Sequence, residues 1–316
     1  MGPGGPLPRY DELPYLESLR ARHCWGVFGA KDDLGTVNLL TPEVVSRAAG
    51  EIRRGAVHSL SLPLDVPYPA LAPRDPYAHR IFRPSRNMQD DVLDGFYPQG
   101  SSQWDGLRHV RAREFGFYNG VGADDAGPGG HRLGIDAWAR HGIAGRGVLA
   151  DVAGYLAARG TPLDPRREFA ITADLLAEVL ARQGTELLGG DILLVRTGFV
   201  GAYLRADTAE RVDFARRQDS PGLAADEDMA RYLWDHRFAA VAADNHAVEC
   251  QPGDPATGFL HRRLIPLLGF ALGEWFDLDS LAAECTAQGR YSCFFAGVPL
   301  NLPGGVGSPA NSIAIT

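Results

Sequence analysis

Lysine is nearly absent from this chain of 316 residues: Lys31 is the only one, so arginine carries almost all of the positive charge. The formal net charge is -8. An acidic balance of this size argues against a nucleic-acid partner, and no basic face for a membrane surface is evident. We interpret the arginine excess as a coding bias and not as an arginine-based binding function.

Cysteine is also scarce, and long apolar runs are missing. The four cysteines are scattered without C-x-x-C spacing, which argues against a disulfide framework and favours reduced thiols. No stretch approaches the apolar length of a membrane span. The N-terminus lacks the basic region and apolar run of a signal peptide. We therefore expect a soluble, cytoplasmic protein.

Several catalytic and cofactor motifs are absent. The chain has no G-x-x-x-x-G-K-[ST], no G-x-S-x-G and no H-E-x-x-H. The glycine-rich run at 304–309 follows a predicted strand, but no helix follows it to hold a phosphate. These absences argue against a nucleotide cofactor and against a serine hydrolase of the α/β type.

The periodicity that is present predicts alternating helices and strands, and hence an α/β or mixed α+β architecture. Residues 1–24 are expected to be an N-terminal extension, partly disordered, and residues 25–316 a single domain. Residues 66–98 show little periodicity and are expected to be a long loop. We expect helices over residues 13–22, 42–49, 135–141, 172–183, 225–236, 260–268 and 279–288. We expect strands over 58–64, 147–152, 191–198, 238–244, 270–275 and 291–299.

The run from Gln99 to His109 concentrates polar chemistry in a short segment. If this segment is extended, the side chains of Gln99, Gln103, Asp105 and His109 point to one face. Such a row can form one wall of a polar site. A surface loop with scattered polar residues would show the same pattern, so this run alone leaves both interpretations open.

Metal or acid–base chemistry fits the remaining candidates best, because histidine and carboxylate side chains bind Zn²⁺ or Mn²⁺ and a bound metal lowers the pKa of water. Glu274 follows an apolar run, where an acid is out of place unless a partner holds it. His261 is also typical of a solvent-facing histidine at a helix start. His246 and Glu249 form a weaker pair. The candidates are Asp105, His109, His261 and Glu274.

Aromatic residues surround the run. Trp104, Phe96, Tyr97 and Phe115 lie near it in sequence and favour an aromatic or apolar substrate, since ligand pockets are mostly apolar with few polar anchors. Core packing explains each of these residues equally well. We expect Trp104 to contact the substrate.

Several segments together resemble the cyclase family that includes kynurenine formamidase, isatin hydrolase and polyketide cyclase-like proteins. The family signature is H-x-G-T-H-x-D-x-P-x-H, and residues 99–109 read Q-G-S-S-Q-W-D-G-L-R-H in the same register. The resemblance covers about residues 25–316. It extends to the segments 33–42, 141–151, 190–198, 273–281 and 304–309.

The resemblance implies a swivelling β/β/α fold, with a mixed sheet or barrel flanked by helices, in homodimers or higher homo-oligomers. It also implies hydrolysis of an amide or lactam by a metal-bound water. In that scheme Asp105 is a metal ligand, His109 is the general acid/base, and His261 and Glu274 are later ligands. Both ligand histidines of the signature are replaced here, by Gln99 and Gln103.

The two glutamines change the expected chemistry. An amide oxygen is a weaker ligand than imidazole, so a metal held by Asp105, Glu274 and His261, with help from Gln103, would be Mn²⁺ or Mg²⁺ more readily than Zn²⁺. Alternatively the site binds no metal. His109 then transfers protons, oriented by Asp105 or Glu274, while the amides of Gln99 and Gln103 bind the substrate.

Three functions remain open at this point. The first is a metal-assisted hydrolase of a cyclic amide, lactone or N-acyl aromatic small molecule, and it is the one we expect, in secondary metabolism. The second is a metal-independent cyclase, isomerase or lyase of a natural-product-type substrate that uses His109 for proton transfer. The third is a small-molecule-binding protein without activity. In each case the expected partner is a small molecule.

Overall fold

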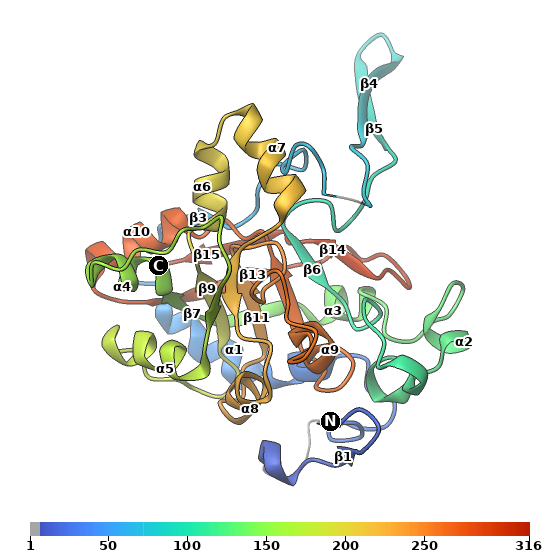
Figure 1. The fold of residues 1–316 in the computed structure, drawn as a ribbon. Coiled ribbons are helices and arrows are strands. Elements are labelled where there is room, and N and C mark those ends of the chain that lie inside the picture. The colour runs from blue at the N-terminus through green and yellow to red at the C-terminus, as the bar shows by residue number, and fades with distance from the viewer. Residues whose placement is uncertain (1–6, 72) are drawn as a thin grey trace.

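Four apolar segments form the centre of a nine-stranded mixed sheet in the computed structural model, which describes residues 7–71 and 73–316 (Figure 1). These central strands are parallel, and nearly all of their side chains are buried. A parallel sheet covered on both faces explains why they appear in the sequence as continuous apolar runs. They are β12 (Ala271–Glu274), β11 (Ala240–Ala243), β9 (Ile192–Arg196) and β7 (Ile143–Asp151).

Antiparallel strands extend the sheet at both edges. The strand order is β14-β6-β12-β11-β9-β7-β13-β15-β3, so β6 and β14 lie at one edge and the other three at the opposite edge. The expected mixed sheet flanked by helices is thereby confirmed. The edge strands are β6 (Gln103–Asp105), β14 (Gly307–Pro309), β13 (Ser292–Gly297), β15 (Ser312–Ile315) and β3 (Val57–Ser59).

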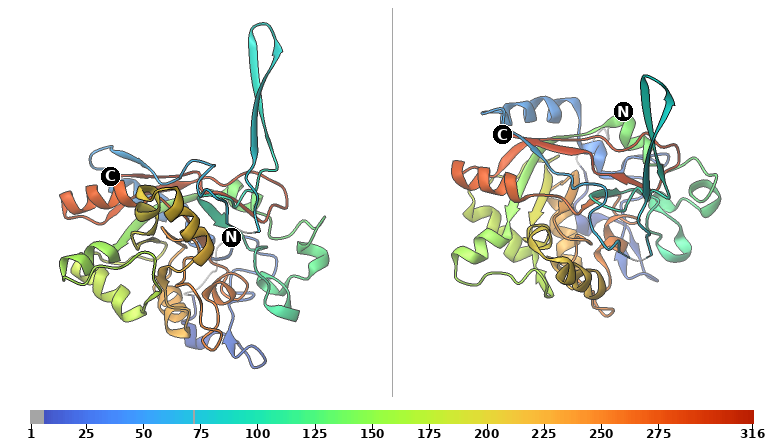
Figure 2. Two further views of the ribbon diagram at one scale, coloured as in Figure 1. Left: turned by 45° about the horizontal axis from the view of Figure 1, so that its top comes forward. Right: turned by 90° about the horizontal axis from the view of Figure 1, so that it is seen from above.

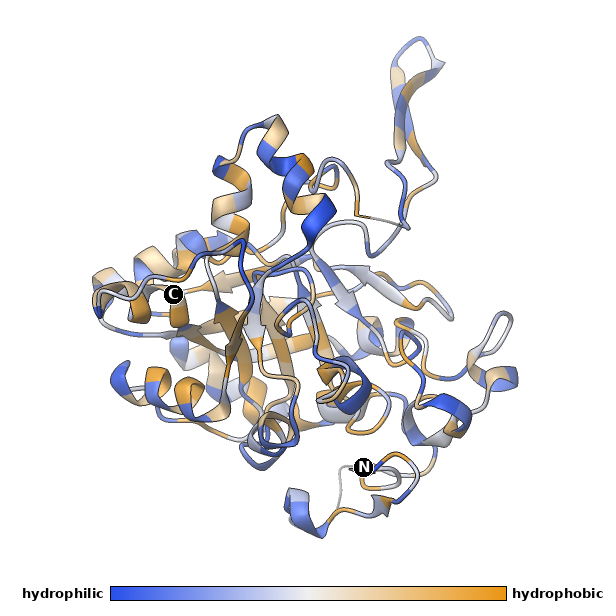
Figure 3. Ribbon diagram, in the orientation of Figure 1, coloured by the Kyte–Doolittle hydropathy of each residue, from blue (hydrophilic) through white to orange (hydrophobic). Residues whose placement is uncertain are grey.

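Amphipathic helices surround the sheet. Colouring by hydropathy shows that the central strands are mostly apolar, whereas the helices around them carry both polar and apolar residues (Figure 3). Side-chain caps begin several of them: Thr41 accepts from Val44 N at 3.4 Å, and Thr172 accepts from Leu175 N at 3.2 Å. The helices are α1 (Pro42–Ala48), α2 (Ala123–Ala126), α3 (Asp136–His141), α4 (Val152–Ala158), α5 (Ala173–Arg182), α6 (Phe199–Arg205), α7 (Thr208–Arg217), α8 (Glu227–Asp235), α9 (Leu260–Leu264) and α10 (Asp279–Gln288).

Smaller elements lie outside the main sheet. The β4–β5 hairpin projects away from the body in all three views (Figures 1 and 2). The two-stranded pairs are β1 (Tyr15–Leu16) with β2 (Ala21–Arg22), β8 (Phe169–Ile171) with β10 (Pro221–Leu223), and β4 (Ala78–Ser85) with β5 (Met88–Asp94). Short 3-10 turns are η1 (Tyr10–Glu12), η2 (Gly35–Leu39), η3 (Ala49–Glu51), η4 (Arg113–Phe115) and η5 (Tyr118–Gly120).

Most expected elements are present, and the exceptions have physical causes. The helix predicted over residues 13–22 is wrong, because this segment forms the antiparallel pair β1–β2. The helix predicted over 260–268 ends at Leu264, since Pro266 cannot continue it. The expected strand at 58–64 is limited to β3. The long loop expected over 66–98 contains the β4–β5 hairpin. Helices α2, α4, α6 and α7 and strands β8, β10, β14 and β15 were not predicted.

The described part of the predicted N-terminal extension packs on the body. Tyr10, Leu13 and Cys24 are buried in the main core. The indole of Trp234 donates to the carbonyl of Pro8 at 3.0 Å. Residues 1–6, which belong to the segment expected to be disordered, lie outside the described residues. The domain boundary at residue 24 stays a prediction.

Two findings concern the environment of the chain. In the described part of the chain, no helix combines the length and the apolar composition needed to cross a membrane. All four cysteines are free thiols and buried.

Strand β6 divides its side chains between the core and the opposite face of the sheet. Trp104 is 0% exposed and packs edge-on against Phe276 and Phe295, with ring centroids 5.2 and 6.1 Å away. Its indole nitrogen donates to the carbonyl of Ala310 at 3.0 Å. Gly273, opposite Trp104, has no room for a side chain, because a Cβ there would lie 2.6 Å from the ring of Phe276. Trp104 is therefore a core residue.

We expect Trp104→Phe to lower the free energy of unfolding by about 1–3 kcal/mol, because the smaller ring leaves a cavity and the carbonyl of Ala310 keeps only the hydroxyl of Ser312 as a side-chain donor. Urea denaturation measures the change. Tyr97→Phe is the matched control: Tyr97 is 41% exposed, and the loss of its hydroxyl should change stability by less than about 0.5 kcal/mol. Equal stability of the two variants would contradict the assignment of Trp104 to the core.

Candidate active site

The register between β6 and β12 builds the first part of the site. Gln103 lies directly opposite Glu274 in this antiparallel pair, so both side chains project from one face. Asp105, two residues farther along β6, projects from the same face. Gln103 Nε2 donates to Glu274 Oε2 at 2.6 Å and to Asp105 Oδ1 at 3.2 Å. Because both acids draw the amide nitrogen, Gln103 Oε1 is left buried without a hydrogen-bond partner in the described residues.

Turns, and not an extended strand, bring Gln99 and His109 to the same place. Only residues 103–105 of the run are a strand. A turn closed by Gly100 N and the carbonyl of Tyr97 precedes them, and another follows, in which His109 N donates to the carbonyl of Gly106 at 2.9 Å. The four side chains expected to share a face do meet, but the predicted extended conformation is wrong at both ends.

Gln99 connects the acid to the imidazole. Its Nε2 donates to Asp105 Oδ1 and lies 3.2 Å from His109 Nδ1. His109 Nε2 lies 3.7 Å from Asp105 Oδ2. Burial lowers the pKa of His109 below its usual 6.5, with Asp105 opposing the shift. The imidazole is therefore neutral at neutral pH and can accept a proton.

His261, on the short helix α9, sits among three carboxylates. Glu249 Oε2 accepts from His261 N at 2.8 Å and lies 2.9 Å from Nδ1. On the other side of the ring, His261 Nε2 lies 3.1 Å from Glu274 Oε1 and 3.4 Å from Asp105 Oδ2. Burial alone would lower the pKa of His261, but the charge of Glu249 and the closeness of Asp105 and Glu274 raise it well above 6.5.

The pKa values of the two acids on the sheet, Asp105 and Glu274, shift in opposite directions. Burial is the largest influence on Asp105, yet His109, His261 and the Gln99 amide together hold the pKa of Asp105 below 3.8. Burial and the neighbouring charge of Asp105 raise the pKa of Glu274 to about 7. Groups whose environments separate their pKa values in this way are typical of catalytic sites.

The arrangement fits a divalent cation. Asp105, His261 and Glu274 each offer a ligand atom, and these atoms all lie within 4.8 Å of one another. Asp105 Oδ2, like Gln103 Oε1, is buried without a hydrogen-bond partner in the described part of the chain. Glu249 binds His261 Nδ1 and leaves Nε2 facing the other ligands, as carboxylates behind metal-binding histidines do. A donor set of oxygens with one imidazole suits Mn²⁺ or Mg²⁺.

The site opens into a cavity of about 440 Å³, which is large enough for a small-molecule ligand. We call this the active-site cavity. The cavity is lined by Gln103, His109, Glu249, His261 and Glu274, and also by residues of loops and short elements. The latter include Arg74, Gln218, His246, Gln251, Phe259 and Arg262.

His246 and Glu249, the weaker pair of the sequence, both line this cavity. Glu249 orients His261, whereas His246 packs on Phe199 with ring centroids 5.2 Å apart. Burial lowers the pKa of His246 to about 4, so its imidazole is neutral. The position of Glu249 after a buried strand is the signal that made it a candidate in the sequence, since loops after strands often carry function.

The aromatic residues near the run do not line the active-site cavity. Phe96 and Tyr97 line a separate, smaller cavity, and Phe115 packs on another hydrophobic cluster. Trp104 faces the opposite side of the sheet with no exposed surface, which corrects the expectation that it contacts the substrate. Phe259 is the aromatic lining residue, and the sequence did not single it out.

Comparisons with known proteins identify the family. The model of the Cyclase family matches residues 58–250. A crystal structure described as a novel cyclase is 35% identical over 93% of this chain and 99% of its own, with a TM-score of 0.81. This chain belongs to the cyclase family. It is accordingly an enzyme, of the hydrolase or cyclase type, and the resemblance seen in the sequence is confirmed.

Structures with lower sequence identity share the fold of this chain. Isatin hydrolase A from Labrenzia aggregata, bound to benzyl benzoate, is 17% identical over 86% of this chain and 97% of its own, with a TM-score of 0.58. A structure from Bacillus stearothermophilus, described as a predicted metal-dependent hydrolase, is 18% identical over 82% of this chain and 97% of its own, with a TM-score of 0.51. No curated protein matches the chain.

We expect Glu249→Gln to destabilise the protein, because the charge that faces the His261 ring is lost inside the fold. The free energy of unfolding should fall by about 1–3 kcal/mol in urea denaturation. Glu168→Gln, at an exposed acid, is the control and should stay within about 0.5 kcal/mol of the wild type. The same stability for both variants would show that Glu249 does not hold His261.

Proposed function

We propose that this cyclase-family enzyme hydrolyses an amide or lactone bond in a small molecule: a cyclic amide, a lactone or an N-acyl aromatic compound. One observation carries the proposal. A neutral His109 lies beside Asp105, and the unpartnered oxygens of Asp105 and Gln103 lie near His261 and Glu274. Gln103, His109, His261 and Glu274 line one cavity. A base and a set of cation ligands thus meet where a substrate can enter.

Asp105, His261 and Glu274 would hold the divalent cation, with Gln103 Oε1 as a further oxygen donor. When bound, such a cation supplies Lewis-acid polarisation of a carbonyl and lowers the pKa of water. The oxygen-rich set favours Mn²⁺ or Mg²⁺ over Zn²⁺. The hydrolase activity proposed for this chain rests on these residues together with His109.

His109 moves the proton. Its neutral ring accepts a proton from the attacking water, and the imidazolium formed is stabilised by Asp105, 3.7 Å away. The same proton then passes to the leaving nitrogen or oxygen. Gln99 Nε2 faces His109 Nδ1 and competes for its lone pair. The contact with Gln99 must therefore loosen, or the ring must exchange its tautomer, when the substrate binds. Gln103 lines the cavity and Gln99 lies behind it beside Asp105 and His109, and we retain both as proposed substrate-binding residues.

A second function is favoured by the surroundings of His261. An imidazolium there, with carboxylates 2.9, 3.1 and 3.4 Å from its nitrogens, offsets much of the negative charge without a cation. The enzyme would then be a metal-independent cyclase, isomerase or lyase of a natural-product-type substrate, with His109 as the proton-transfer group. The metal content of the protein separates the two functions.

The quaternary structure, compartment and metabolic role stay predictions. The β4–β5 hairpin supports a homodimer or higher homo-oligomer, because an isolated two-stranded hairpin is marginal and this one exposes apolar residues. Ile81 and Met88 on it are 65% and 60% exposed. We retain the cytoplasm and secondary metabolism as the proposed setting.

Purified protein is expected to contain stoichiometric Mn²⁺, Mg²⁺ or Zn²⁺ by elemental analysis. A chelator should remove both metal and activity, and added Mn²⁺ should restore activity. Asp105→Asn should lose the metal, because it removes a charged ligand. Asp125→Asn, at an exposed acid of α2, is the control and should retain it. Full activity in metal-free protein would eliminate the hydrolase mechanism and support the metal-independent one.

His109→Ala is expected to lower turnover by about 10²- to 10⁴-fold, which is the usual contribution of a general acid/base. The assay uses a panel of cyclic amides, lactones and N-acyl aromatic compounds, and circular dichroism checks that the fold is retained. His141→Ala, at an exposed histidine of α3, is the control and should keep wild-type activity. Wild-type activity in the His109→Ala enzyme would contradict both proposed functions.

A further inference from the structure

Five arginines line a second cavity that adjoins the active-site cavity. Its volume is about 450 Å³, and none of its lining residues is an aspartate or a glutamate. We call it the arginine cavity. Its arginines come from the β1–β2 turn, from the segment after the catalytic run, and from α9. They are Arg20, Arg111, Arg113, Arg262 and Arg263.

The charges of these arginines are not offset by acids. Within the described chain, none of the five lies within 4.0 Å of a carboxylate oxygen. Arg263 donates to the carbonyls of Ala225 and Thr257, each at 3.1 Å. Arg262 lies 4.7 Å from the ring centroid of Phe259. These contacts orient the guanidinium groups without neutralising them.

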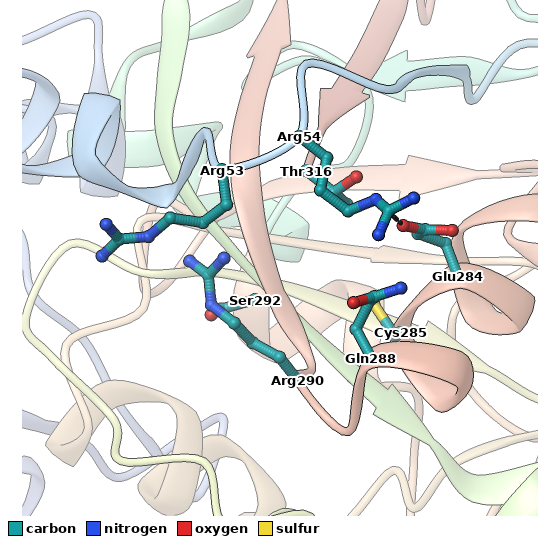
Figure 4. Close-up of a pocket in the computed structure, with 8 residues that line it drawn as sticks. All are labelled: Arg53, Arg54, Glu284, Cys285, Gln288, Arg290, Ser292 and Thr316. Carbon is teal, nitrogen blue, oxygen red and sulfur yellow. Dashed lines mark ion pairs between the residues drawn. The ribbon is translucent and has the colours of Figure 1, made fainter.

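Another cavity of the protein shows the contrast (Figure 4). It has a volume of about 180 Å³ and is also lined by arginines, but acids lie beside them. Arg54 pairs with Glu284 at 3.1 Å, and Arg290 pairs with Glu51. Two of the three arginines that line this cavity have an acid partner among the described residues, and Arg53 has none. In the arginine cavity none of the five has one.

A cluster of arginines without acid partners favours the binding of an anionic ligand. Like charges around one cavity repel each other, and an anion that enters removes the repulsion. Guanidinium groups bind phosphate and carboxylate in a planar, two-point geometry. Arg20 and Arg113 both adopt left-handed backbone conformations, with φ of 49° and 50°, which are uncommon outside glycine and gather at functional sites.

The two cavities are neighbours, since Phe259 and Arg262 line both. Arg74, which also has no acid partner in the described residues, lines the active-site cavity. A ligand longer than one cavity would contact residues of both. Its reacting bond would lie beside His109, and its far end would lie among the arginines.

We propose that the arginine cavity binds the anionic end of the substrate, which then belongs to the phosphate esters or polycarboxylates that also carry a hydrolysable amide or lactone. This proposal rests on the proposed hydrolase function for the reacting end alone; binding of an anion does not depend on it. It also revises our first interpretation of the arginine content, because these five arginines have a binding role beyond coding bias.

Calorimetric titration with inorganic pyrophosphate tests the site on the whole protein. Wild type should bind it saturably, and the double variant Arg111→Gln/Arg113→Gln should bind at least about tenfold more weakly, through the loss of charged hydrogen bonds. The control Arg83→Gln/Arg86→Gln removes two exposed arginines of the β4–β5 hairpin that also have no acid partner there. Absent binding, or the same loss in both double variants, would overturn the proposal.

A kinetic arm identifies the source of the anion. For substrate pairs that differ only in a phosphate or carboxylate tail, Arg111→Gln/Arg113→Gln should raise KM more for the anionic member than for the neutral one. If pyrophosphate binds but both members respond equally, the assignment to the substrate is overturned. Pyrophosphate binding that persists in His109→Ala would show that the arginine cavity stands even where the hydrolase function fails.

Discussion

The antiparallel pairing of β6 with β12 determines where Asp105, Gln103 and Glu274 lie, and the other charged groups of the site gather around these three. It sets Gln103 opposite Glu274 and places Asp105 on the same face, while Trp104 enters the core opposite Gly273. A slip of one residue would exchange the two faces, burying carboxylates among aromatic rings and exposing the indole. The close packing of Gly273 on Phe276 and the indole bond to Ala310 both oppose that slip.

Burying three carboxylates together is costly unless partners offset their charge. Here the two glutamines act first as donors: Gln99 and Gln103 both direct their amide nitrogens at Asp105. His261 supplies the remaining compensation from the other side. The amides thereby stabilise the acids with hydrogen bonds, and the oxygens left without a partner in the described residues are Gln103 Oε1 and Asp105 Oδ2. On our proposal, these oxygen donors explain why the site would bind a hard cation such as Mn²⁺ or Mg²⁺ weakly and would not bind Zn²⁺ tightly.

Elements that depend on a local residue pattern could be predicted from the sequence, whereas elements and contacts that depend on tertiary packing could not. The central strands were recognisable because β7, β9, β11 and β12 are apolar throughout. The segment 13–22 was misassigned because pairing between β1 and β2 overrides its local preference for helix. His109 reaches Asp105 through a turn that alternation cannot show, and Glu249 reaches His261 across 12 residues and a loop. Arg74 and Phe259 lie in irregular segments, where no periodicity marks a lining residue.

The two adjoining cavities differ in charge, and this difference gives a substrate only one orientation. On our proposal, an anionic group is repelled by Asp105 and Glu274 and attracted by the arginines, so the neutral acyl end enters beside His109. Hydrolysis then creates a carboxylate next to acids that are already buried. The new repulsion favours departure of that product, whereas Arg262, shared by both cavities, gives it a route toward positive charge.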